Sequence, residues 1–238
     1  AVSIAAGFSH TCAILDDGSV SCWGYNYAGS LGNGVSGNGA DENTPTQTAS
    51  LGEGRTAIEI ASGNEHTCAI LDDGTVSCWG YNNQGQLGDG TTTDTHTPTQ
   101  TMSLGEGRTA ADISAGQYHT CAILDNGSVS CWGYNNYGQL GNGTQTGDDD
   151  DGRFFPGPTS SLGEDRTAVG IATGDYHTCV ILDDGTVKCW GRNTHGHLGD
   201  GTTTTRLTPT PTSSLGVSVA AVGITAGHYF TCAILDDG

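Results

Sequence analysis

Basic residues are scarce in this sequence, and their scarcity excludes one class of partner. The 238 residues include 7 Lys and Arg against 26 Asp and Glu, which gives a formal net charge of −19 at pH 7. Proteins bind nucleic acids largely by neutralising phosphate charge with Lys and Arg. A chain this acidic cannot form a continuous basic face, so no nucleic-acid partner is expected. A cationic partner or divalent ions remain compatible with the charge.

Long apolar runs are also absent. A membrane-spanning helix needs about 20 consecutive apolar residues, and no stretch of this chain has them, so no membrane span is expected. Hydrophobic residues make up 34% of the chain, and glycines number 39. This composition indicates short strands joined by many turns instead of helices.

Internal repetition is the strongest feature that the sequence does have. The stretch His66–Gly80 reads His-Thr-Cys-Ala-Ile-Leu-Asp-Asp-Gly-Thr-Val-Ser-Cys-Trp-Gly. It recurs at 10–24, 119–133 and 177–191, and a fifth copy runs from Thr231 to Gly238. Val, Ile, Thr and Trp favour strands, while Asp-Asp-Gly favours a type I turn followed by a left-handed glycine. Each copy is therefore predicted to be a β-hairpin.

The predicted hairpin register also pairs the cysteines. With the loop at 72–74, Leu71 faces Thr75, and Cys68 lies opposite Cys78 in a non-hydrogen-bonded pair, where Cα atoms approach most closely. The same register predicts the disulfides Cys12–Cys22, Cys68–Cys78, Cys121–Cys131 and Cys179–Cys189. Regularly spaced cysteines indicate an oxidising compartment, outside the cell or at its surface. Cys232 has no partner in this scheme.

Each repeat unit extends beyond its hairpin. A short strand precedes the hairpin, and a Trp-Gly-x-Asn-x-x-Gly-x-Leu-Gly-x-Gly segment follows it, as in 79–90. A polar segment with proline closes the unit and is expected to add a fourth, outer strand, because proline is tolerated at a sheet edge. We expect one repeat domain over 1–238, a fragment of a longer secreted chain. Its repeats lie at approximately 3–58, 59–111, 112–169, 170–222 and 223–238, the last one truncated.

The repeat resembles that of the regulator-of-chromosome-condensation (RCC1-type) superfamily. The shared pattern is Gly-x-x-His-Thr-x-Ala-Ile-Leu-x-x-Gly-x-Val-x-x-Trp-Gly-x-Asn-x-x-Gly-Gln-Leu-Gly-x-Gly, and it covers essentially the whole chain. The resemblance implies an all-β fold of propeller blades, in a family whose propellers have seven blades and hold partner proteins on one face. The paired cysteines depart from the family motif and suggest a disulfide-containing secreted variant. Four complete repeats and a partial fifth suggest a partial propeller or an open repeat array.

Histidines and carboxylates in the repeats have both a chemical and a structural interpretation. A histidine two positions before each first cysteine suggests a His-Cys-Cys zinc site, but this set is one ligand short of a structural tetrahedron. We interpret these residues as hydrogen-bonding groups inside the blade: His10, His66, His119 and His177. The Asp-Asp-Gly sites resemble catalytic carboxylate pairs, and we interpret them as turn formers. The pair His195 and His197 is interpreted as polar and exposed.

A run of carboxylates in the fourth repeat boundary region is the one candidate for a bound ion. Carboxylate clusters suit Ca²⁺, and the candidate ligands are Asp148, Asp149, Asp150 and Asp151. The run does not match the EF-hand pattern, so a solvated acidic insertion is the favoured interpretation. Apart from this Ca²⁺, we expect no metal and no cofactor.

Aromatic residues at repeat-variable positions are the candidate partner-binding residues. Loops on a rigid scaffold collect binding residues, and tyrosine is a frequent binding anchor. The candidates lie just before the hairpins or directly after Trp-Gly: Phe8, Tyr118, Tyr176, Tyr229, Tyr25, Tyr81 and Tyr134. The alternative is that these rings only pack between blades.

The sequence contains no nucleophile elbow, phosphate-binding loop or Cys-His catalytic pairing, so an enzyme is not expected. We expect an extracellular binding or adhesion module that uses loops of one propeller face to hold a protein or a glycan. The alternative is a structural repeat protein of a cell-surface layer or an extracellular filament, which associates with itself through its blade ends.

We predict that the protein does not bind DNA or RNA even at low ionic strength, where cationic binders gain most affinity. A filter-binding assay with duplex DNA and single-stranded RNA measures this, with a basic DNA-binding protein of similar size as the positive control. Retention of either nucleic acid at micromolar protein concentration would contradict the prediction.

Overall fold

The structure is a computed structural model that describes residues 1–145 and 154–237. This part of the chain contains eighteen β-strands and no α-helix. The strands are β1 (Ser3–Ala6), β2 (His10–Ile14), β3 (Val20–Gly24), β4 (Glu42–Gln47), β5 (Ala57–Ser62), β6 (His66–Leu71), β7 (Val76–Gly80), β8 (Thr95–Gln100), β9 (Ala110–Ala115), β10 (His119–Leu124), β11 (Val129–Gly133), β12 (Gly157–Pro158), β13 (Ala168–Thr173), β14 (His177–Leu182), β15 (Val187–Gly191), β16 (Arg206–Pro211), β17 (Ala221–Ala226) and β18 (Thr231–Leu235). Within these ranges there is no apolar helix of the length that a lipid bilayer requires.

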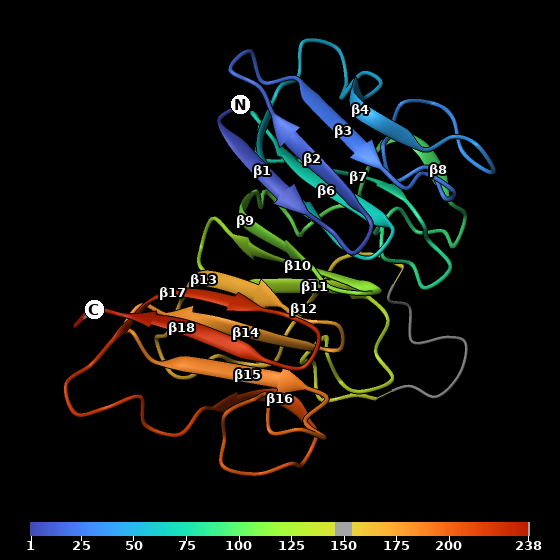
Figure 1. The fold of residues 1–238 in the computed structure, drawn as a ribbon. Coiled ribbons are helices and arrows are strands. Elements are labelled where there is room, and N and C mark those ends of the chain that lie inside the picture. The colour runs from blue at the N-terminus through green and yellow to red at the C-terminus, as the bar shows by residue number, and fades with distance from the viewer. Residues whose placement is uncertain (146–153, 238) are drawn as a thin grey trace.

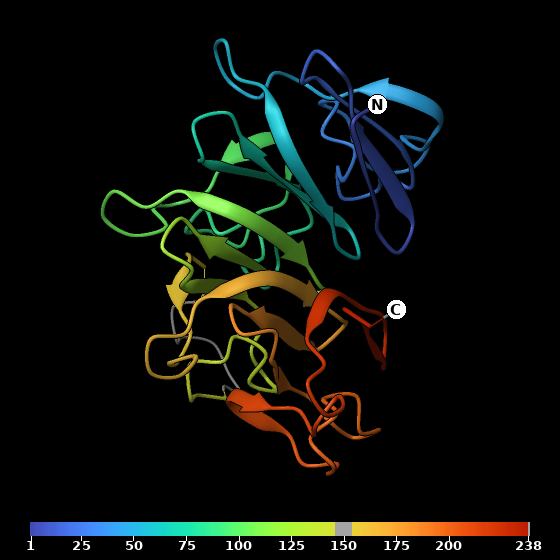
Figure 2. The same ribbon diagram turned by 90° about the vertical axis from the view of Figure 1, so that its left-hand side faces the viewer.

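The strands form antiparallel sheets that have the order of propeller blades. The described chain has four four-stranded sheets, β1-β2-β3-β4 and its three successors, and a two-stranded sheet of β17 and β18. The first strands of successive blades are neighbours, so β1, β5, β9, β13 and β17 lie on the inner side of the array (Figures 1 and 2). The proline-containing segments form the fourth strands, as predicted. The all-β, blade-like fold is confirmed.

The blades follow one another from β1 to the β17–β18 hairpin and do not close into a ring (Figure 1). Of the two architectures that the sequence left open, the described residues therefore adopt an unclosed propeller. One consequence is that both ends of the array present a blade face with no neighbour. Val2 and Ile4 on the first blade and Val222 and Ile234 on the last hairpin are more than half exposed.

The hairpins have the predicted register. In the second blade, the Leu71 N–H donates to the Thr75 carbonyl at 2.8 Å, and the Gly74 N–H donates to the Leu71 carbonyl at 2.8 Å. Gly74 has a φ of 77°, the left-handed conformation that glycine adopts without steric cost. Cys68 and Cys78 are direct partners across the two strands. A local turn rule therefore fixes which side chains meet.

The structure contains the four disulfides predicted from this register. Each joins two strands of one hairpin, with a Cα–Cα distance of 4.1 Å. All eight sulfur-bearing residues are fully buried. Cys232 is a free, exposed cysteine. In the described chain the disulfides therefore staple complete blades only.

The apolar core lies between blades. Val129 and Leu140 of the third blade pack against Ile171, Leu182 and Trp190 of the fourth, and the two preceding interfaces have the same composition. The indole side chains of Trp79, Trp132 and Trp190 are fully buried. Removing a buried Trp or Phe side chain typically costs about 3–5 kcal/mol. Adjacent blades therefore stabilise each other.

We predict that replacing Cys121 and Cys131 together by Ala lowers the free energy of unfolding by about 2–3 kcal/mol, because an 11-residue loop is no longer closed in the unfolded chain. Urea unfolding followed by circular dichroism measures the change. The matched control, Cys232→Ala, removes an exposed thiol that forms no disulfide, and its unfolding midpoint should equal that of the wild type. Equal midpoints for all three proteins would contradict the prediction.

Candidate functional site

Five of the loop tyrosines form a continuous set of ring contacts across three blades. We call this set the tyrosine row: Tyr81, Tyr118, Tyr134, Tyr137 and Tyr176. Ring centroids lie 6.1 Å apart for Tyr81 and Tyr118, and 5.9 Å apart for Tyr134 and Tyr176. Tyr137 meets Tyr176 edge to face at 5.2 Å, an arrangement that aromatic rings favour. Each ring is half-buried, so the row is both packed and accessible.

Arg192 extends the row toward the last hairpin. It stands directly after Trp190-Gly191, where the other blades carry tyrosine. Its guanidinium carbon lies 5.1 Å from the centroid of the Tyr137 ring, 5.7 Å from that of Tyr176 and 5.4 Å from that of Tyr229. Such distances are typical of cation–π contacts. The structure thus shows that this aromatic surface accommodates a guanidinium group.

Two of the predicted binding positions lie apart from the row. Tyr25 stacks on Tyr27 with centroids 6.4 Å apart, in the first blade. Phe8 is 84% exposed and lies at the inner side of the array, beside Gly63 and Asn64. The sequence placed all seven candidates in one class, whereas the structure joins Tyr81, Tyr118, Tyr134 and Tyr176 in the row, connects Tyr229 through Arg192, and leaves Phe8 and Tyr25 outside.

Carboxylates surround the first part of this surface. Burial raises the pKa of Tyr81, and the nearby Tyr118, Asp94 and Glu65 raise it further. The pKa of Tyr25 is also raised, by burial first and then by Glu65 and Asp41. Burial and the neighbouring rings and Asp175 raise the pKa of Tyr176 to about 12. These hydroxyls therefore stay protonated at neutral pH and can donate hydrogen bonds next to a negative potential.

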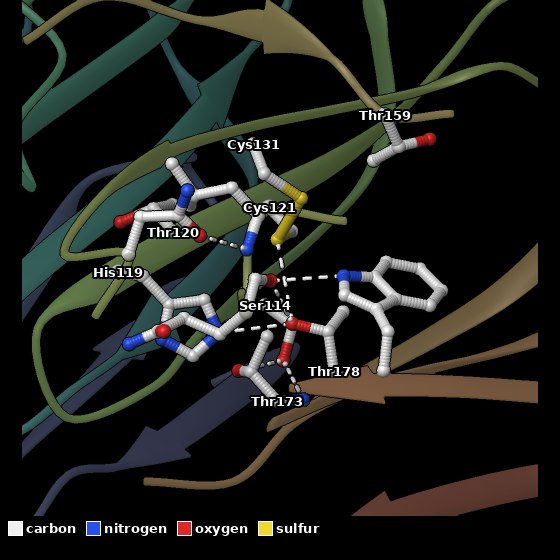
Figure 3. The surroundings of a disulfide bond; sticks show 12 residues. Ser114, His119, Thr120, Cys121, Cys131, Thr159, Thr173 and Thr178 are labelled. Carbon is white, nitrogen blue, oxygen red and sulfur yellow. Dashed lines mark hydrogen bonds between the residues drawn. A yellow bond between two sulfur atoms is a disulfide. The ribbon is translucent and has the colours of Figure 1, made fainter. Parts of the chain in front are cut away.

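The repeat histidines connect neighbouring blades. In Figure 3, the Nε2 atom of His119 lies 3.0 Å from the Thr178 hydroxyl of the next blade. That hydroxyl donates to the Gln139 carbonyl at 2.9 Å, and the same carbonyl accepts the Trp190 indole N–H at 2.9 Å. Because the Thr178 hydrogen is already used, the histidine must donate from Nε2. The ring is therefore neutral, and its buried Nδ1 has no hydrogen-bond partner in the described structure.

This contact repeats at each blade junction of the described chain. The corresponding Nε2–Oγ1 distances are 2.8 Å for His10 and Thr67, 3.0 Å for His66 and Thr120, and 3.0 Å for His177 and Thr231. The histidines were predicted to hydrogen-bond inside their own blade. That interpretation is wrong in its partner, because the acceptor threonine belongs to the following repeat. Thr always follows His in the repeat, so the sequence contained the signal.

A glycine three residues before each histidine makes room for the ring. A Cβ atom on Gly63 would lie 2.2 Å from Cε1 of His66 and 2.5 Å from the Gly116 carbonyl of the next blade. Contacts this short exclude any side chain. The Gly-x-x-His spacing therefore reflects the close approach of an imidazole to backbone, and it is a structural requirement.

The alternative chemical interpretations find no support in the geometry. All cysteines near the histidines are in disulfides and cannot act as thiolate ligands. In the described ranges no group of three His, Cys, Asp or Glu side chains could hold a metal ion. The Ca²⁺ candidate residues Asp148–Asp151 lie outside the described residues. The Asp-Asp pairs act in turns: Asp73 Oδ1 accepts the Thr75 N–H at 3.0 Å and the Thr75 hydroxyl at 2.7 Å.

The interpretation of His195 and His197 as exposed is wrong for one of them. His197 is only 6% exposed, and its ring centroid lies 4.6 Å from that of His177. It occupies the repeat position of Gln86 and Gln139, and its carbonyl accepts the Thr231 hydroxyl at 2.9 Å. His195 is exposed and lies against Tyr229.

One acidic pair escaped the sequence analysis. Glu59 on β5 and Asp112 on β9 interact on neighbouring inner strands, and burial raises the pKa of both, that of Glu59 to about 7. Their positions in the repeat differ from the conspicuous Asp-Asp turns. They are brought together because first strands of adjacent blades are neighbours, which a single repeat does not reveal.

A family model described as RCC1-like domain matches residues 1–238. The chain belongs to the RCC1-like domain family. It is 32% identical over 206 residues to the ultraviolet-B receptor UVR8 of Arabidopsis thaliana, covering 87% of this chain and 44% of that protein. It is 30% identical over 239 residues to human E3 ubiquitin-protein ligase HERC2, covering 98% of this chain and 5% of that protein. The chain thus spans less than half the length of these curated relatives.

Solved structures agree on the fold. Human WBSCR16 has a TM-score of 0.84 at 22% identity, over 98% of this chain and 57% of that one. Yeast RCC1 (Prp20), in its complex with Kap60, has a TM-score of 0.82 at 23% identity, over 99% of this chain and 54% of that one. At these identities the similarity shows the RCC1-type propeller fold alone. The resemblance stated from the repeat motif is confirmed.

The junction histidines predict a characteristic loss of stability in acid. Burial lowers their pKa to about 4 for His10 and about 3 for His66, His119 and His177. Between pH 6.5 and those values the unfolded chain binds protons that the folded protein excludes. The free energy of unfolding is therefore highest above pH 6.5 and falls as the pH drops toward 3, by about 1.4 kcal/mol per pH unit and histidine.

We predict that His119→Phe reduces this slope by about 1.4 kcal/mol per pH unit between pH 6 and 4, because one proton-excluding group is lost. Phenylalanine fits over the glycine, since Phe230 lies in the same way over Gly227 in the last hairpin. Urea unfolding at several pH values measures the slope. His195→Phe changes an exposed histidine and is the control that should keep the wild-type slope; identical slopes for the two variants would contradict the prediction.

Proposed function

We propose that the tyrosine row is the partner-binding surface of an extracellular, non-enzymatic protein-binding module. The observation that carries this proposal is the unbroken set of ring contacts from Tyr81 to Tyr176, continued by Arg192 to Tyr229. Rings that are already held by neighbours lose little conformational entropy when a partner covers them. Packing between blades would explain burial of these rings, but the rings of the row remain partly exposed.

The surroundings of the row favour a partner with basic side chains. Glu65, Asp94 and Asp41 act on Tyr81 and Tyr25 at one end of the surface. At the other end, Arg192 already lies over three aromatic rings. In the first two blades tyrosine occupies the position of Arg192, so a cation there has to come from outside. An Arg or Lys side chain of a partner would meet both ring faces and carboxylates.

Two further observations support a protein ligand and an extracellular location. Yeast RCC1, which has the same fold, has been crystallised with the protein Kap60, and a second study of yeast Prp20p concerns its binding to Gsp1p and histones. These partners belong to those proteins and support only the kind of ligand. The four buried disulfides of the described chain support an oxidising, extracellular environment.

A structural role in a surface layer or filament is the second candidate, and the exposed ends of the array favour it. Val2 is 69% exposed on the first blade, and Ile234 is 67% exposed on the last hairpin. Apolar blade faces of this kind are normally covered by a neighbouring repeat. Multi-angle light scattering at rising concentration separates the candidates, because a binding module stays of constant mass whereas a filament protein polymerises.

We predict that the double variant Tyr118→Ser, Tyr176→Ser loses binding to partners selected by the wild type. A displayed random-peptide library, selected on the wild-type protein, should enrich peptides with Arg or Lys next to apolar residues. Affinity of the enriched peptides for the double variant should fall at least about tenfold, as expected when central aromatic anchors are removed. The substitutions leave the net charge unchanged, so a purely electrostatic interaction would persist.

The matched control is Val169→Ser, Val217→Ser, which removes two exposed apolar side chains outside the row. It should bind the enriched peptides like the wild type. If the tyrosine variant retains full affinity, or the control loses as much, the row is a packing feature and the proposal fails.

A further inference from the structure

The groove between the fourth blade and the β17–β18 hairpin differs from the other blade junctions of the described chain. At the three preceding junctions, the core cluster includes the tryptophan of the following blade. The fourth cluster has the same kind of residues, with Val187, Cys189 and Leu198 on one side and Ile224 and Ala233 on the other, but it includes no tryptophan. These five residues line an open groove of about 450 Å³.

A glycine at each junction marks the position of the indole ring. A Cβ atom on Gly32, Gly88 or Gly141 would lie 2.7, 2.7 and 2.5 Å from the Nε1 atom of the tryptophan that fills that junction. These three glycines are buried, whereas the equivalent Gly199 is exposed. A Cβ atom on Gly199 would find its nearest neighbour, Thr212, at 3.7 Å. The indole position at this junction is therefore accessible from solvent.

The groove also offers the polar partner that an indole uses. At the other junctions, the carbonyls of Ser30, Gln86 and Gln139 each accept both a threonine hydroxyl and an indole N–H. The equivalent carbonyl of His197 accepts the Thr231 hydroxyl at 2.9 Å. Leu215 at the rim is 36% exposed, while its counterpart Leu162 is 6% exposed. An apolar ring with one donor would complete these contacts.

The edge of β18 lies beside this groove. In the four-stranded blades the second strand pairs with a third strand, and a cysteine of one faces a cysteine of the other. In the described residues β18 pairs with β17 alone. Cys232 occupies the position of Cys121 and Cys179 and is exposed. An unpaired strand edge accepts an additional strand through main-chain hydrogen bonds.

We propose that this junction is a docking site for an added β-strand of the same type as β7, β11 and β15, with the sequence Val-x-Cys-Trp-Gly. The strand pairs antiparallel with β18, its tryptophan fills the groove, and the indole N–H donates to the His197 carbonyl. Its cysteine then faces Cys232. The occupant is identified by the three filled junctions of this same chain, which hold that strand and that side chain in equivalent surroundings.

The experiment adds the strand in trans to the 238-residue protein. The probe is a fluorescein-labelled peptide that copies residues 75–82, Thr-Val-Ser-Cys-Trp-Gly-Tyr-Asn, with Ser in place of its cysteine. Fluorescence anisotropy should show saturable binding. The same peptide with Trp79→Ala should bind at least about tenfold more weakly, as expected for a buried aromatic anchor.

Two protein variants locate the site. Leu215→Asp places a charge at the rim of the groove and should weaken peptide binding at least about tenfold. Val217→Asp changes a residue of the same loop that is 94% exposed and does not line the groove, and it should bind like the wild type. Both residues are exposed, so neither variant compromises the core.

A covalent probe tests the register. The peptide with its native cysteine is supplied as the mixed disulfide with 2-thiopyridine. The Cys232 thiolate attacks the peptide sulfur, a disulfide forms between the two cysteines, and the thiopyridyl sulfur leaves as pyridine-2-thione with the electron pair, so no oxidant is required. Mass spectrometry should find the cross-link at Cys232, formed several-fold faster than with the Trp79→Ala peptide.

Equal binding of the two peptides, equal affinity of Leu215→Asp and the wild type, or equal cross-linking rates would overturn the proposal. Concentration-dependent dimers that Leu215→Asp dissociates would also overturn it, because a second intact copy would then occupy the groove. None of these outcomes depends on the tyrosine row, so they leave the proposed function untouched.

Discussion

The blade junction is the interaction on which the rest of the structure depends. At each filled junction of the described chain, one carbonyl of a blade accepts a threonine hydroxyl and an indole N–H from the next blade. The strands themselves are rich in Ala, Ser and Thr and bury little apolar area within one sheet. The apolar clusters therefore form between sheets, where the tryptophans are fully buried. A single blade has no complete core of its own, and stability accumulates through neighbours.

The histidines and disulfides make this junction rigid in two directions. Each disulfide holds the two central strands of a blade together, while each histidine donates across to the next blade. Because the imidazole lies against backbone at the preceding glycine, the loop just before it has little freedom. Tyr118 and Tyr176 directly precede His119 and His177 in sequence. The positions of the tyrosine rings are thus set by the same contacts that join the blades.

Charge distribution separates this surface from the rest of the molecule. The chain carries a net charge of −19, and several of its few arginines are used in turns, as in the Arg55 contacts with Asp72 and Asp73. Arg192 instead lies over aromatic rings in the face that we propose for partner binding. An acidic, aromatic surface with one built-in cation discriminates by ring geometry as well as by charge. This combination explains how a strongly acidic protein can still bind one class of partner selectively.

The sequence by itself determined the hairpins, their register and the disulfides, because each depends on contacts within about fifteen residues. The Asp-Asp-Gly turn places Cys68 opposite Cys78 whatever surrounds the blade, and the recurrence of the motif identifies the fold family. What only the tertiary structure decided depends on contacts between repeats. A single repeat shows neither that His119 reaches Thr178, 59 residues away, nor that His197 is buried beside His177. Likewise, Phe8 and Tyr118 follow the same sequence rule, yet one is isolated and the other joins a row. The reason is physical: local turn chemistry fixes each blade, while the packing of one blade on the next decides which loop side chains meet.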